Sequence, residues 1–501
     1  MSKGICYLVG AGPGDLGLAT LRAKECIEEA DVLVYDYLSN AEMLKWAKPG
    51  VELIYAGKKA KAHTIPQDQL NQLLVDKCKE GKVVTRLKGG DPIIFGRGGE
   101  EAAELREAGV AFEIVPGISS SIAGPIYAGI PVTHRACNSQ LTIFTGHEDP
   151  TKKETSIDYA HLAKTPGTKV MLMGVERLGA ATTALLEAGA DPKMPVGLVR
   201  WATTERQETI VGELANIAQK VKDANFKAPA VCVFGEVVNL REKLQWFDNR
   251  ALTGKRIVVT RTRQQAGVLS KKLRSLGADV FELPTIRIDP PKDRMEFGRL
   301  VQDCHTYDWI VFTSPNGVDA FFDLFYKLYK DARSIGGARI AAIGPGTAKK
   351  INEYRITVDV LPEEYVAESL LEAMTKESIE NQTILCVKAE TTRDVLYEGL
   401  AKAGAIVDEG IAYRTVAETE DPTGGRERFT TEGADVITFT SSSTVEHFLD
   451  MKLPLPKDLK IASIGPITSQ TLRDKGLYVD IEAEQHDIPG LVEAIANHFA
   501  S

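Results

Sequence analysis

Short apolar runs alternate along the whole chain with stretches in which apolar residues recur at helical spacing. Runs such as ICYLVG (5–10), DVLVYD (31–36) and KRIVVT (255–260) are rich in β-branched residues and lead into polar or glycine-containing turns. Continuous apolar runs of this length are typical of strands that are buried on both faces. Their alternation with helical patterns predicts an α/β fold with mainly parallel sheets.

The alternation of strand and helix patterns is interrupted near the middle of the chain. The polar passage DNRALT (248–253) follows a long apolar and helical stretch, and a new strand pattern begins directly after it. We therefore expect the main domain boundary near residue 250, with one part spanning 1–250 and the other 251–501.

The second part repeats its own pattern. The segments SLGADV (275–280), FTSPN (312–316) and IGPGT (343–347) return in similar form as KAGAIV (402–407), FTSSS (439–443) and IGPIT (464–468). The copies lie too far apart for a solenoid repeat, and their spacing suits two similar α/β lobes. The alternative is that these motifs are common strand-end turns that arose independently.

The glycine-rich turn VGAGPGD (9–15) follows the first apolar run and suggests a nucleotide site. A dinucleotide fingerprint needs a third glycine where Asp15 stands, although Asp36 lies where an acid could bind ribose hydroxyls. The Gly-Lys-Ser/Thr ending of a phosphate-binding loop is missing here and in RLKGGDPIIFGRGGEE (86–101). Glycines and prolines of this kind suit a compact polar ligand that backbone groups approach closely. A nicotinamide dehydrogenase stays open as an alternative.

Composition excludes several classes of protein. The chain has 501 residues, 44% apolar and 26% charged, and it lacks the roughly 20-residue apolar stretch of a membrane span. Its start shows no signal-peptide pattern, so we expect a cytoplasmic protein. The net charge of −9 disfavours a general nucleic-acid surface. The seven cysteines form no CxxC motif and the eight histidines no HxH or HExxH motif, so we expect neither disulfides nor a metal site.

A series of short motifs spans residues 4–247. They are VGAGPGD (9–15), YD (35–36), GK (57–58), HTIPQ (63–67), RLKGGDP (86–92), FGRGGEE (95–101), VPGISS (115–120), YAGIPVTHR (127–135), TGH (145–147), MG (173–174) and PAVCVFGEVVNLREKLQWF (229–247). Together and in this order they resemble the tetrapyrrole methylase family, specifically its uroporphyrinogen-III C-methyltransferases. The resemblance implies two α/β lobes with S-adenosyl-L-methionine bound in the cleft between them.

The same resemblance implies a reaction and the residues that serve it. Two methyl groups would pass from S-adenosyl-L-methionine to ring carbons of uroporphyrinogen III, without a metal, to give precorrin-2. Asp36 and Lys58 match the family's proposed proton acceptor and donor. The positions that match cofactor contacts are Pro13, Gly89, Gly90, Asp91, Ile94, Ser119, Ser120, Met173 and Ala230, with Ala202 standing where a glycine often approaches the cofactor.

The carboxylates of the substrate would be bound by cationic side chains. Arg86, Arg97, His134 and Arg135 could bind them through charge-assisted hydrogen bonds, or could instead pair with neighbouring acids such as Glu100 and Glu101. Other candidates also have structural alternatives, because Asp36 could cap a strand-end turn and Lys58 could be a solvated lysine. Met173 could equally be a core side chain.

Residues 254–501 carry a second series of motifs. They are VVTRTR (258–263), FTSPNGVDAFF (312–322), IGPGT (343–347), VKAETTRDVL (387–396), YRT (413–415), TFTSSSTVEHF (438–448) and IASIGPITSQTLRDKG (461–476). Jointly they resemble the uroporphyrinogen-III synthase family. That family's fold implies two lobes joined by a two-stranded linker, one from about 254–287 plus 416–501 and the other from 288–412.

The implied synthase reaction closes hydroxymethylbilane into uroporphyrinogen III, with inversion of the last pyrrole and loss of water. Tyr413 matches a family tyrosine that is suggested to assist departure of the hydroxyl group. Strand-end groups that would suit this polyanionic substrate are Thr260, Ser314, Asn316, Thr347, Ser441, Ser442 and Thr468. Their alternative role is ordinary helix capping.

Two adjacent biosynthetic steps on one chain form a coherent hypothesis. The C-terminal half would make uroporphyrinogen III and the N-terminal half would methylate it, with small-molecule partners only. The chain length leaves no room for a dehydrogenase–ferrochelatase domain, so we expect precorrin-2 as the end product. A homodimer through the methylase half is implied by resemblance alone. The alternative is that the C-terminal lobes are a noncatalytic module that binds an anionic metabolite.

Overall fold

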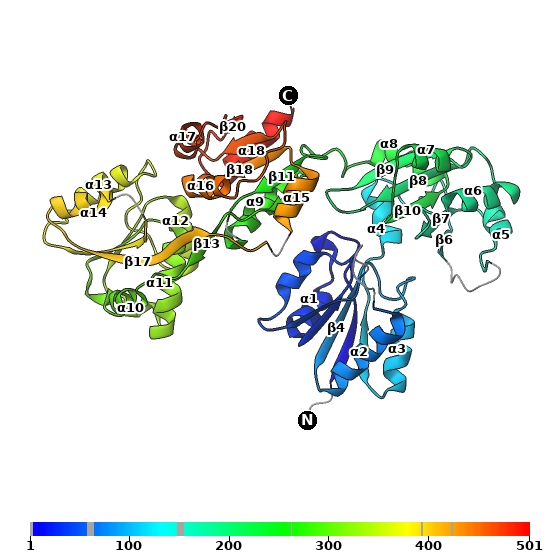
Figure 1. Cartoon of the computed structure of the whole chain (residues 1–501), viewed down its shortest axis with the longest axis horizontal. Helices are drawn as coiled ribbons and strands as arrows, with labels where there is room; N and C mark the ends of the chain where they lie inside the picture. Colours follow the sequence, from blue (N-terminus) through cyan, green and yellow to red (C-terminus); the bar gives the residue numbers. More distant parts are fainter. Residues whose placement is uncertain are drawn as a thin grey trace. The chain divides into compact units, whose positions relative to one another are not determined.

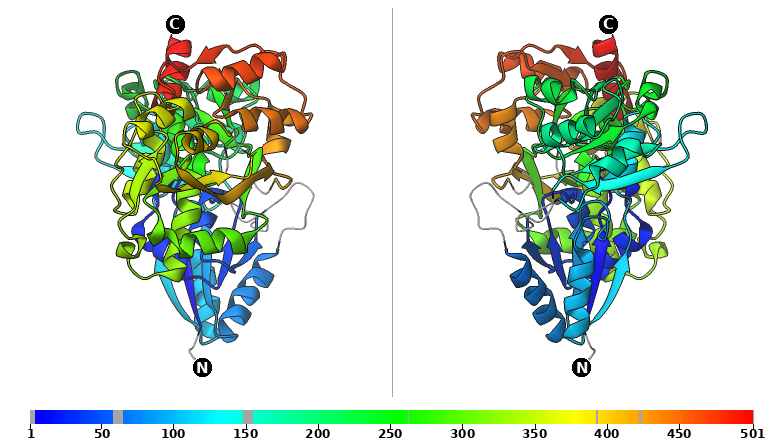
Figure 2. Two further views of the ribbon diagram at one scale, coloured as in Figure 1. Left: turned by 90° about the vertical axis from the view of Figure 1, so that its left-hand side faces the viewer. Right: turned by 90° about the vertical axis from the view of Figure 1, so that its right-hand side faces the viewer.

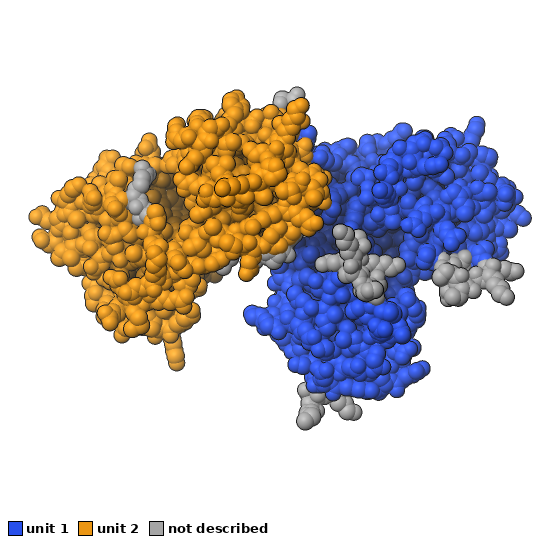
Figure 3. Space-filling model, viewed as in Figure 1, with its two compact units in different colours: residues 1–255, 273–279, 500 blue, residues 256–272, 280–499, 501 orange. Residues whose placement is uncertain are grey.

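The computed structural model describes residues 4–57, 65–147, 155–261, 263–391, 394–421 and 424–500. The chain divides into two compact units (Figure 3): the first comprises residues 1–255 and 273–279, and the second 256–272 and 280–499. The sequence does not anticipate that the segment 273–279 belongs to the first unit. Within the described residues, no helix is both long enough and apolar enough to cross a membrane.

The first unit begins with five parallel strands in the order β3-β2-β4-β1-β5. They are β1 (Ile5–Gly10), β2 (Val32–Tyr35), β3 (Glu52–Tyr55), β4 (Val83–Lys88) and β5 (Ala111–Val115). Side chains alternate along a strand, so Cys6 and Leu8 pack on one face of the sheet and Tyr7 and Val9 on the other. Both faces are buried, which accounts for the continuous apolar runs.

Helices cover both faces of this sheet. Helix α1 (Leu21–Glu29) packs on the face of Tyr7, whereas α2 (Gln67–Lys79) and α3 (Gly98–Glu107) lie side by side on the opposite face (Figures 1 and 2). Because all five strands are parallel, the loops that follow them gather at one edge of the sheet. That edge carries the candidate cofactor residues of the N-terminal motifs.

The second sheet of this unit is mixed. Its strands, in the order β6-β7-β10-β8-β9, are β6 (Leu141–Thr145), β7 (Thr168–Leu172), β8 (Pro195–Arg200), β9 (Glu208–Glu213) and β10 (Ala230–Phe234). Only β6 and β7 pair in parallel. The mainly parallel arrangement of the chain does not extend to this sheet, because β10 lies antiparallel between β7 and β8 and a short loop joins β8 to its antiparallel neighbour β9. Its helices are α4 (Ser120–Tyr127), α5 (Tyr159–Lys164), α6 (Leu178–Glu187), α7 (Ile217–Asp223) and α8 (Arg241–Leu244).

Two further five-stranded sheets form the second unit. The third sheet, β12-β11-β18-β19-β20, consists of β11 (Arg256–Val259), β12 (Asp279–Glu282), β18 (Val436–Phe439), β19 (Lys460–Ser463) and β20 (Ile481–Glu482). The fourth, β13-β17-β16-β14-β15, consists of β13 (Ile286–Asp289), β14 (Trp309–Phe312), β15 (Arg339–Ala342), β16 (Thr383–Ala389) and β17 (Ile406–Ala417). Its pairs are parallel except β13 with β17.

Ten α-helices in the described residues accompany these strands, and the last of them follows the final strand. Those around the third sheet are α9 (Arg263–Ser275), α15 (Gly425–Glu432), α16 (Ser442–Asp450), α17 (Pro466–Asp474) and α18 (Ile488–Ala500). Those around the fourth sheet are α10 (Arg294–Gln302), α11 (Pro315–Leu328), α12 (Pro345–Glu353), α13 (Ala367–Thr375) and α14 (Val395–Lys402).

The repeated motifs occupy equivalent positions in these two sheets. FTSPN joins β14 to α11 in the fourth sheet, and FTSSS joins β18 to α16 in the third. The strands β13 and β17 cross the lobe limits expected at 287/288 and 412/416, since both belong wholly to the fourth sheet. The strands β13 and β17 pair antiparallel, and the two-stranded linker that the resemblance implies stays a prediction.

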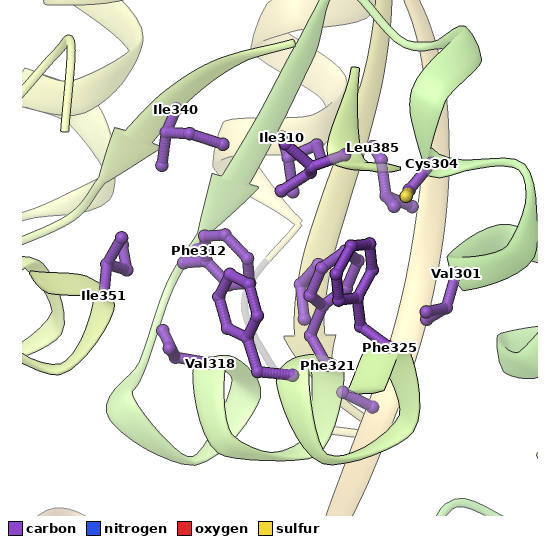
Figure 4. Packing of buried hydrophobic residues seen from close by; sticks show 14 of the residues in the cluster. Val301, Cys304, Ile310, Phe312, Val318, Phe321, Phe325, Ile340, Ile351 and Leu385 are labelled. Carbon is purple, nitrogen blue, oxygen red and sulfur yellow. The ribbon is translucent and has the colours of Figure 1, made fainter. Parts of the chain in front are cut away.

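An aromatic core fixes the helix that follows β14. Val318, Phe321 and Phe325 recur at helical spacing on α11, and all three are fully buried (Figure 4). The rings of Phe321 and Phe312 meet edge to face with centroids 5.4 Å apart. Burial of each phenylalanine contributes about 1.5–3 kcal/mol. The start of α11, with Ser314 as its cap, is therefore held rigidly at the end of β14.

Candidate functional site

Three loops are tied together at the carboxyl edge of the first sheet. The backbones of Gly12 and Gly90 exchange two hydrogen bonds, of 3.1 Å and 2.7 Å, between the loops after β1 and β4. Asp91 accepts from the N–H groups of Ile93 at 2.8 Å, Ile94 at 3.0 Å and Gly117 at 3.1 Å. Because Gly117 follows β5, the Asp91 carboxylate connects the loops after β4 and β5.

Glycines allow these loops to touch backbone to backbone. A Cβ on Gly117 would lie 2.2 Å from the Gly90 carbonyl oxygen and 2.8 Å from the Gly10 Cα. Gly90 itself has a φ of +71°, which side-chain-bearing residues rarely adopt. The loops after β1, β4 and β5, which we call the cradle, therefore meet with no side chain between them, and Gly89, Gly90 and Gly117 keep part of their backbone exposed.

Three candidates from the second sheet also lie at one edge. On β7, Leu172 is paired with Val231 of β10, and this register brings Met173 beside Ala230. On the other side of β10, Ala230 is paired with Arg200, which lies two residues before Ala202. Met173 is 49% exposed, so it is no core side chain. Ala202 is buried, and its methyl group packs towards Gly124 of α4.

Asp15 joins the two sheets of the first unit. Its N–H donates to Thr203 Oγ1 at 3.1 Å, and its Oδ2 accepts from the Tyr127 hydroxyl at 3.1 Å. Burial, aided by Asp15, raises the pKa of Tyr127 to about 12, so the phenol remains a donor at neutral pH. Ser119 caps α4, the helix that ends at Tyr127, and Ser120 is its first residue. Pro13 lies two residues before Asp15 in the same loop.

Sequence reasoning missed Tyr127 and Thr203 as partners of this loop. The available signal was Asp15 itself, which stands in place of the third glycine of a dinucleotide turn. A charged residue there needs partners, and these come from segments far away in the sequence.

Asp36 follows β2 at the same edge as the glycine loops. Its Oδ1 accepts from the N–H groups of Leu38 at 3.0 Å and Ser39 at 3.2 Å, so it caps the turn as its structural alternative predicts. Its Oδ2 faces Arg86 Nη2 at 3.7 Å, and about a quarter of the side chain is exposed. The carboxylate is thus oriented and still accessible. Lys58, its expected partner, lies outside the described residues.

The four candidate cations differ in their surroundings. Arg86 is only 5% exposed and lies between Asp36 and Glu101, and Arg97 pairs with Glu100 at 2.6 Å. The pairing with neighbouring acids is therefore what the structure shows for these two arginines. His134 and Arg135 are exposed in the loop before β6.

In the second unit, Tyr413 lies beside the start of α11. It is paired with Ala389, the last residue of β16, and its hydroxyl is 2.9 Å from Ser314 Oγ. Burial raises the pKa of Tyr413, while hydrogen bonds with Ser314 and Asn316 lower it. The structure thus brings Tyr413, Ser314 and Asn316 together at one strand edge.

The remaining hydroxyl candidates have local partners or are buried. Ser441 caps α16, and Ser442 Oγ lies 2.7 Å from Thr471 Oγ1 on α17. Thr260 is completely buried and donates to the Thr438 carbonyl at 2.7 Å, so its hydroxyl links two strands of the third sheet. Thr347 and Thr468 are buried in the first turns of α12 and α17.

The part of the chain that the structure describes contains no arranged metal site. No group of three or more His, Cys, Asp or Glu side chains there is placed to hold an ion. The seven cysteines are all free thiols.

Comparison with known proteins assigns both halves. The family model of tetrapyrrole (corrin/porphyrin) methylases matches residues 6–218, and that of the uroporphyrinogen-III synthase HemD matches residues 267–493. The porphyrin biosynthesis protein HemD of Ruminiclostridium josui is 35% identical over 99% of this chain and 98% of its own length. The S-adenosyl-L-methionine-dependent uroporphyrinogen III methyltransferase of Methanosarcina barkeri is 50% identical over 48% of this chain and 94% of its own.

Among solved structures, the uroporphyrin-III C-methyltransferase of Thermus thermophilus, complexed with S-adenyl homocysteine, is 37% identical. It covers 47% of this chain and all of its own, with a TM-score of 0.41.

Proposed function

The chain belongs to the tetrapyrrole methylase family in its N-terminal half and to the uroporphyrinogen-III synthase family in its C-terminal half, and from this premise we propose a bifunctional enzyme. The C-terminal unit closes hydroxymethylbilane to uroporphyrinogen III, with inversion of the last pyrrole and loss of water. The N-terminal unit then methylates uroporphyrinogen III twice, giving precorrin-2. The observation that carries the proposal is the match of both family models, in order, in one chain, which aligns over 99% of its length with 98% of a porphyrin biosynthesis protein HemD.

S-adenosyl-L-methionine is the methyl donor in this proposal. The residues suit it, because Gly10, Gly90 and Gly117 let the loops after β1, β4 and β5 approach with no side chain between them, so that backbone groups can contact a ligand. Pro13, Gly89 and Ile94 would hold it from the first sheet, and Met173, Ala202 and Ala230 from the second. Ala202 is compatible with the family's usual glycine, since its methyl group packs towards Gly124. When bound, the molecule supplies a methyl group that its sulfonium already activates; the protein orients the partners and excludes water.

Asp36 is the proton acceptor in the proposed methyl transfer. Addition of a methyl group to a pyrrole carbon requires that the ring lose a proton, and a positioned carboxylate can take it. Hydrogen bonds from Leu38 and Ser39 fix Oδ1, which leaves Oδ2 as the oxygen for the proton. Exposed His134 and Arg135 are proposed to meet substrate carboxylates.

Tyr413 assists departure of the substrate hydroxyl in the proposed cyclisation. Ser314 Oγ accepts from the Gly317 N–H at 3.1 Å and lies 2.9 Å from the Tyr413 oxygen, and we propose that it donates its own proton to that oxygen. The Tyr413 proton is then available to the leaving hydroxyl.

We expect Tyr413→Phe to slow cyclisation about 5- to 30-fold, the cost of losing one hydrogen bond of about 1–2 kcal/mol. Methylation of supplied uroporphyrinogen III should not change. The measurement is the initial rate of type III formation from hydroxymethylbilane. Tyr307→Phe is the matched control, because Tyr307 bonds Asp408 at 2.7 Å and precedes β14, at the opposite end of that strand. Equal slowing by both variants would remove Tyr413 from the chemistry.

A single anaerobic incubation tests both halves. Purified protein receives hydroxymethylbilane and methyl-labelled S-adenosyl-L-methionine, and samples are analysed for porphyrinogen isomer and label. Doubly labelled type III product supports the proposal, whereas unlabelled type III leaves only the synthase. Type I product without acceleration would favour a noncatalytic C-terminal binding module. Titration with NADH tests the alternative of a nicotinamide dehydrogenase, because only that enzyme would bind NADH in place of S-adenosyl-L-methionine.

The proposal also covers the setting of the reaction. Its partners are small molecules, not nucleic acid or membrane, and no metal takes part. We propose a cytoplasmic location, supported by the seven free thiols, because reducing compartments keep cysteines unpaired. Pairing of two chains through the methylase half is part of the same proposal.

A further inference from the structure

Glu101 is a fully buried carboxylate to which the proposed reaction gives no task. It lies in the first turn of α3, which covers the face of the first sheet that carries Arg86 and Lys88. These two cations are two residues apart on β4, so both side chains project from the same face. Leu87 between them packs in the opposite core.

The charged groups form a continuous series that ends at Asp36. Glu101 Oε1 accepts from Lys88 Nζ at 2.7 Å and lies 3.5 Å from Arg86 Nε. Arg86 Nη2 is 3.7 Å from Asp36 Oδ2. Lys88, Glu101 and Arg86 are each less than a tenth exposed. Two cations therefore face two carboxylates, and the balance of charge depends on Glu101.

This network is not fully satisfied. Arg86 Nε and Glu101 Oε2 are buried and have no hydrogen-bond partner among the described residues. Gln67 Nε2 supplies one further bond, of 3.2 Å, to Glu101 Oε1. A partly satisfied buried ionic network is often less stable than well-packed apolar residues. Stability alone therefore does not explain why the protein has this buried network. Its position next to Asp36 suggests a functional reason.

We propose that Glu101 is a positioning residue for methyl transfer, which balances Lys88 and Arg86 so that Asp36 is oriented by Arg86 without being captured in a tight ion pair. The inference rests on the proposed role of Asp36 as proton acceptor. Without the Glu101 charge, two buried cations would face one carboxylate. Arg86 would close on Asp36 and occupy the oxygen that takes the substrate proton.

Glu101 also influences the charge of Lys88. Burial, followed by the nearby Arg86, lowers the pKa of Lys88, and Glu101 opposes this shift. Neutralising Glu101 therefore lowers the pKa of Lys88 further. Lys88 would then lose its proton at a lower pH than in the wild type.

The test is Glu101→Gln, which keeps the side-chain size and removes the charge. We expect methyl transfer at neutral pH to fall at least about tenfold, with S-adenosyl-L-methionine affinity within about threefold of the wild type. The rate of this variant should recover as the pH rises, because loss of the Lys88 proton, at a lower pH than in the wild type, removes the excess positive charge beside Arg86. Glu104→Gln, the same change on an exposed residue of α3, should leave rate and profile unchanged.

A second variant separates charge balance from simple damage. Glu101→Gln combined with Lys88→Met removes one charge of each sign, and the double variant should recover most of the lost rate. If the two substitutions damaged the protein independently, their losses of rate would add. If Glu101→Gln no longer binds S-adenosyl-L-methionine, the double variant still tests the inference. Recovery of the rate in the double variant supports the inference, and absence of recovery overturns it. A wild-type rate and profile in Glu101→Gln overturns it as well. Failure of the wild type to methylate would contradict the proposed function instead.

Discussion

Asp36→Asn is expected to lower methyl transfer at least about a hundredfold while cyclisation of hydroxymethylbilane continues at the wild-type rate. The asparagine oxygen can still accept from Leu38 and Ser39, so the turn after β2 keeps its shape. The amide cannot take up a proton from the substrate ring, however, which removes the proposed general base. The two activities separate because Asp36 belongs to the first unit and Tyr413 to the second.

The measurement is the initial rate of label transfer from S-adenosyl-L-methionine to supplied uroporphyrinogen III, together with calorimetric affinity for the donor. Asp31→Asn serves as the control, because Asp31 directly precedes the strand that Asp36 directly follows and makes structural bonds to Lys48 and the Val83 N–H. It should retain near-normal methylation. Wild-type label transfer by Asp36→Asn would eliminate Asp36 as the base.

Gly117→Ala is expected to abolish tight S-adenosyl-L-methionine binding and to destabilise the first unit by about 3 kcal/mol. The new methyl group would be placed 2.2 Å from the Gly90 carbonyl oxygen, so the loops after β1, β4 and β5 must separate. The Asp91 hydrogen bond to the Gly117 N–H would be lost with them. Methyl transfer should fall with affinity, and cyclisation should be unaffected.

The measurements are the donor affinity by calorimetry and the thermal unfolding of the full-length chain, where we expect the methylase transition to fall by roughly 6–12 °C. Gly179→Ala is the matched control. Gly179 lies inside α6 with open space where its Cβ would be, so alanine there should stabilise slightly. Unchanged affinity in Gly117→Ala would show that the cradle is not the donor site.

Much of the fold could be predicted because its signals are local. The apolar runs that become β1, β2 and β11 are continuous, since both faces of those strands are buried, and this periodicity can be recognised without any partner. The mixed second sheet could not be predicted in the same way. Strand direction there depends on the antiparallel placement of β10 between β7 and β8 and on the short connection from β8 to β9, and a strand pattern carries no information about direction.

The candidate site shows the same division. The glycine turns and the strand-end position of Asp36 can be read from the sequence, because each reflects a local backbone requirement. Whether Arg86 meets Glu101 or a substrate could not be predicted, since both partners were compatible with its type and position. The packing of α3 on this face of the first sheet decides it, by burying Glu101 next to Arg86.

By itself, the sequence determined the α/β class, the two motif series and their families, and the residues that stand at strand ends. Only the tertiary structure decided which of those residues share a site: Asp15 with Tyr127 and Thr203, Tyr413 with Ser314, and Glu101 with Arg86 and Lys88. The physical reason is that hydrogen bonds and ion pairs act over a few ångströms in space. Strand register and helix packing set those distances between segments far apart in the chain.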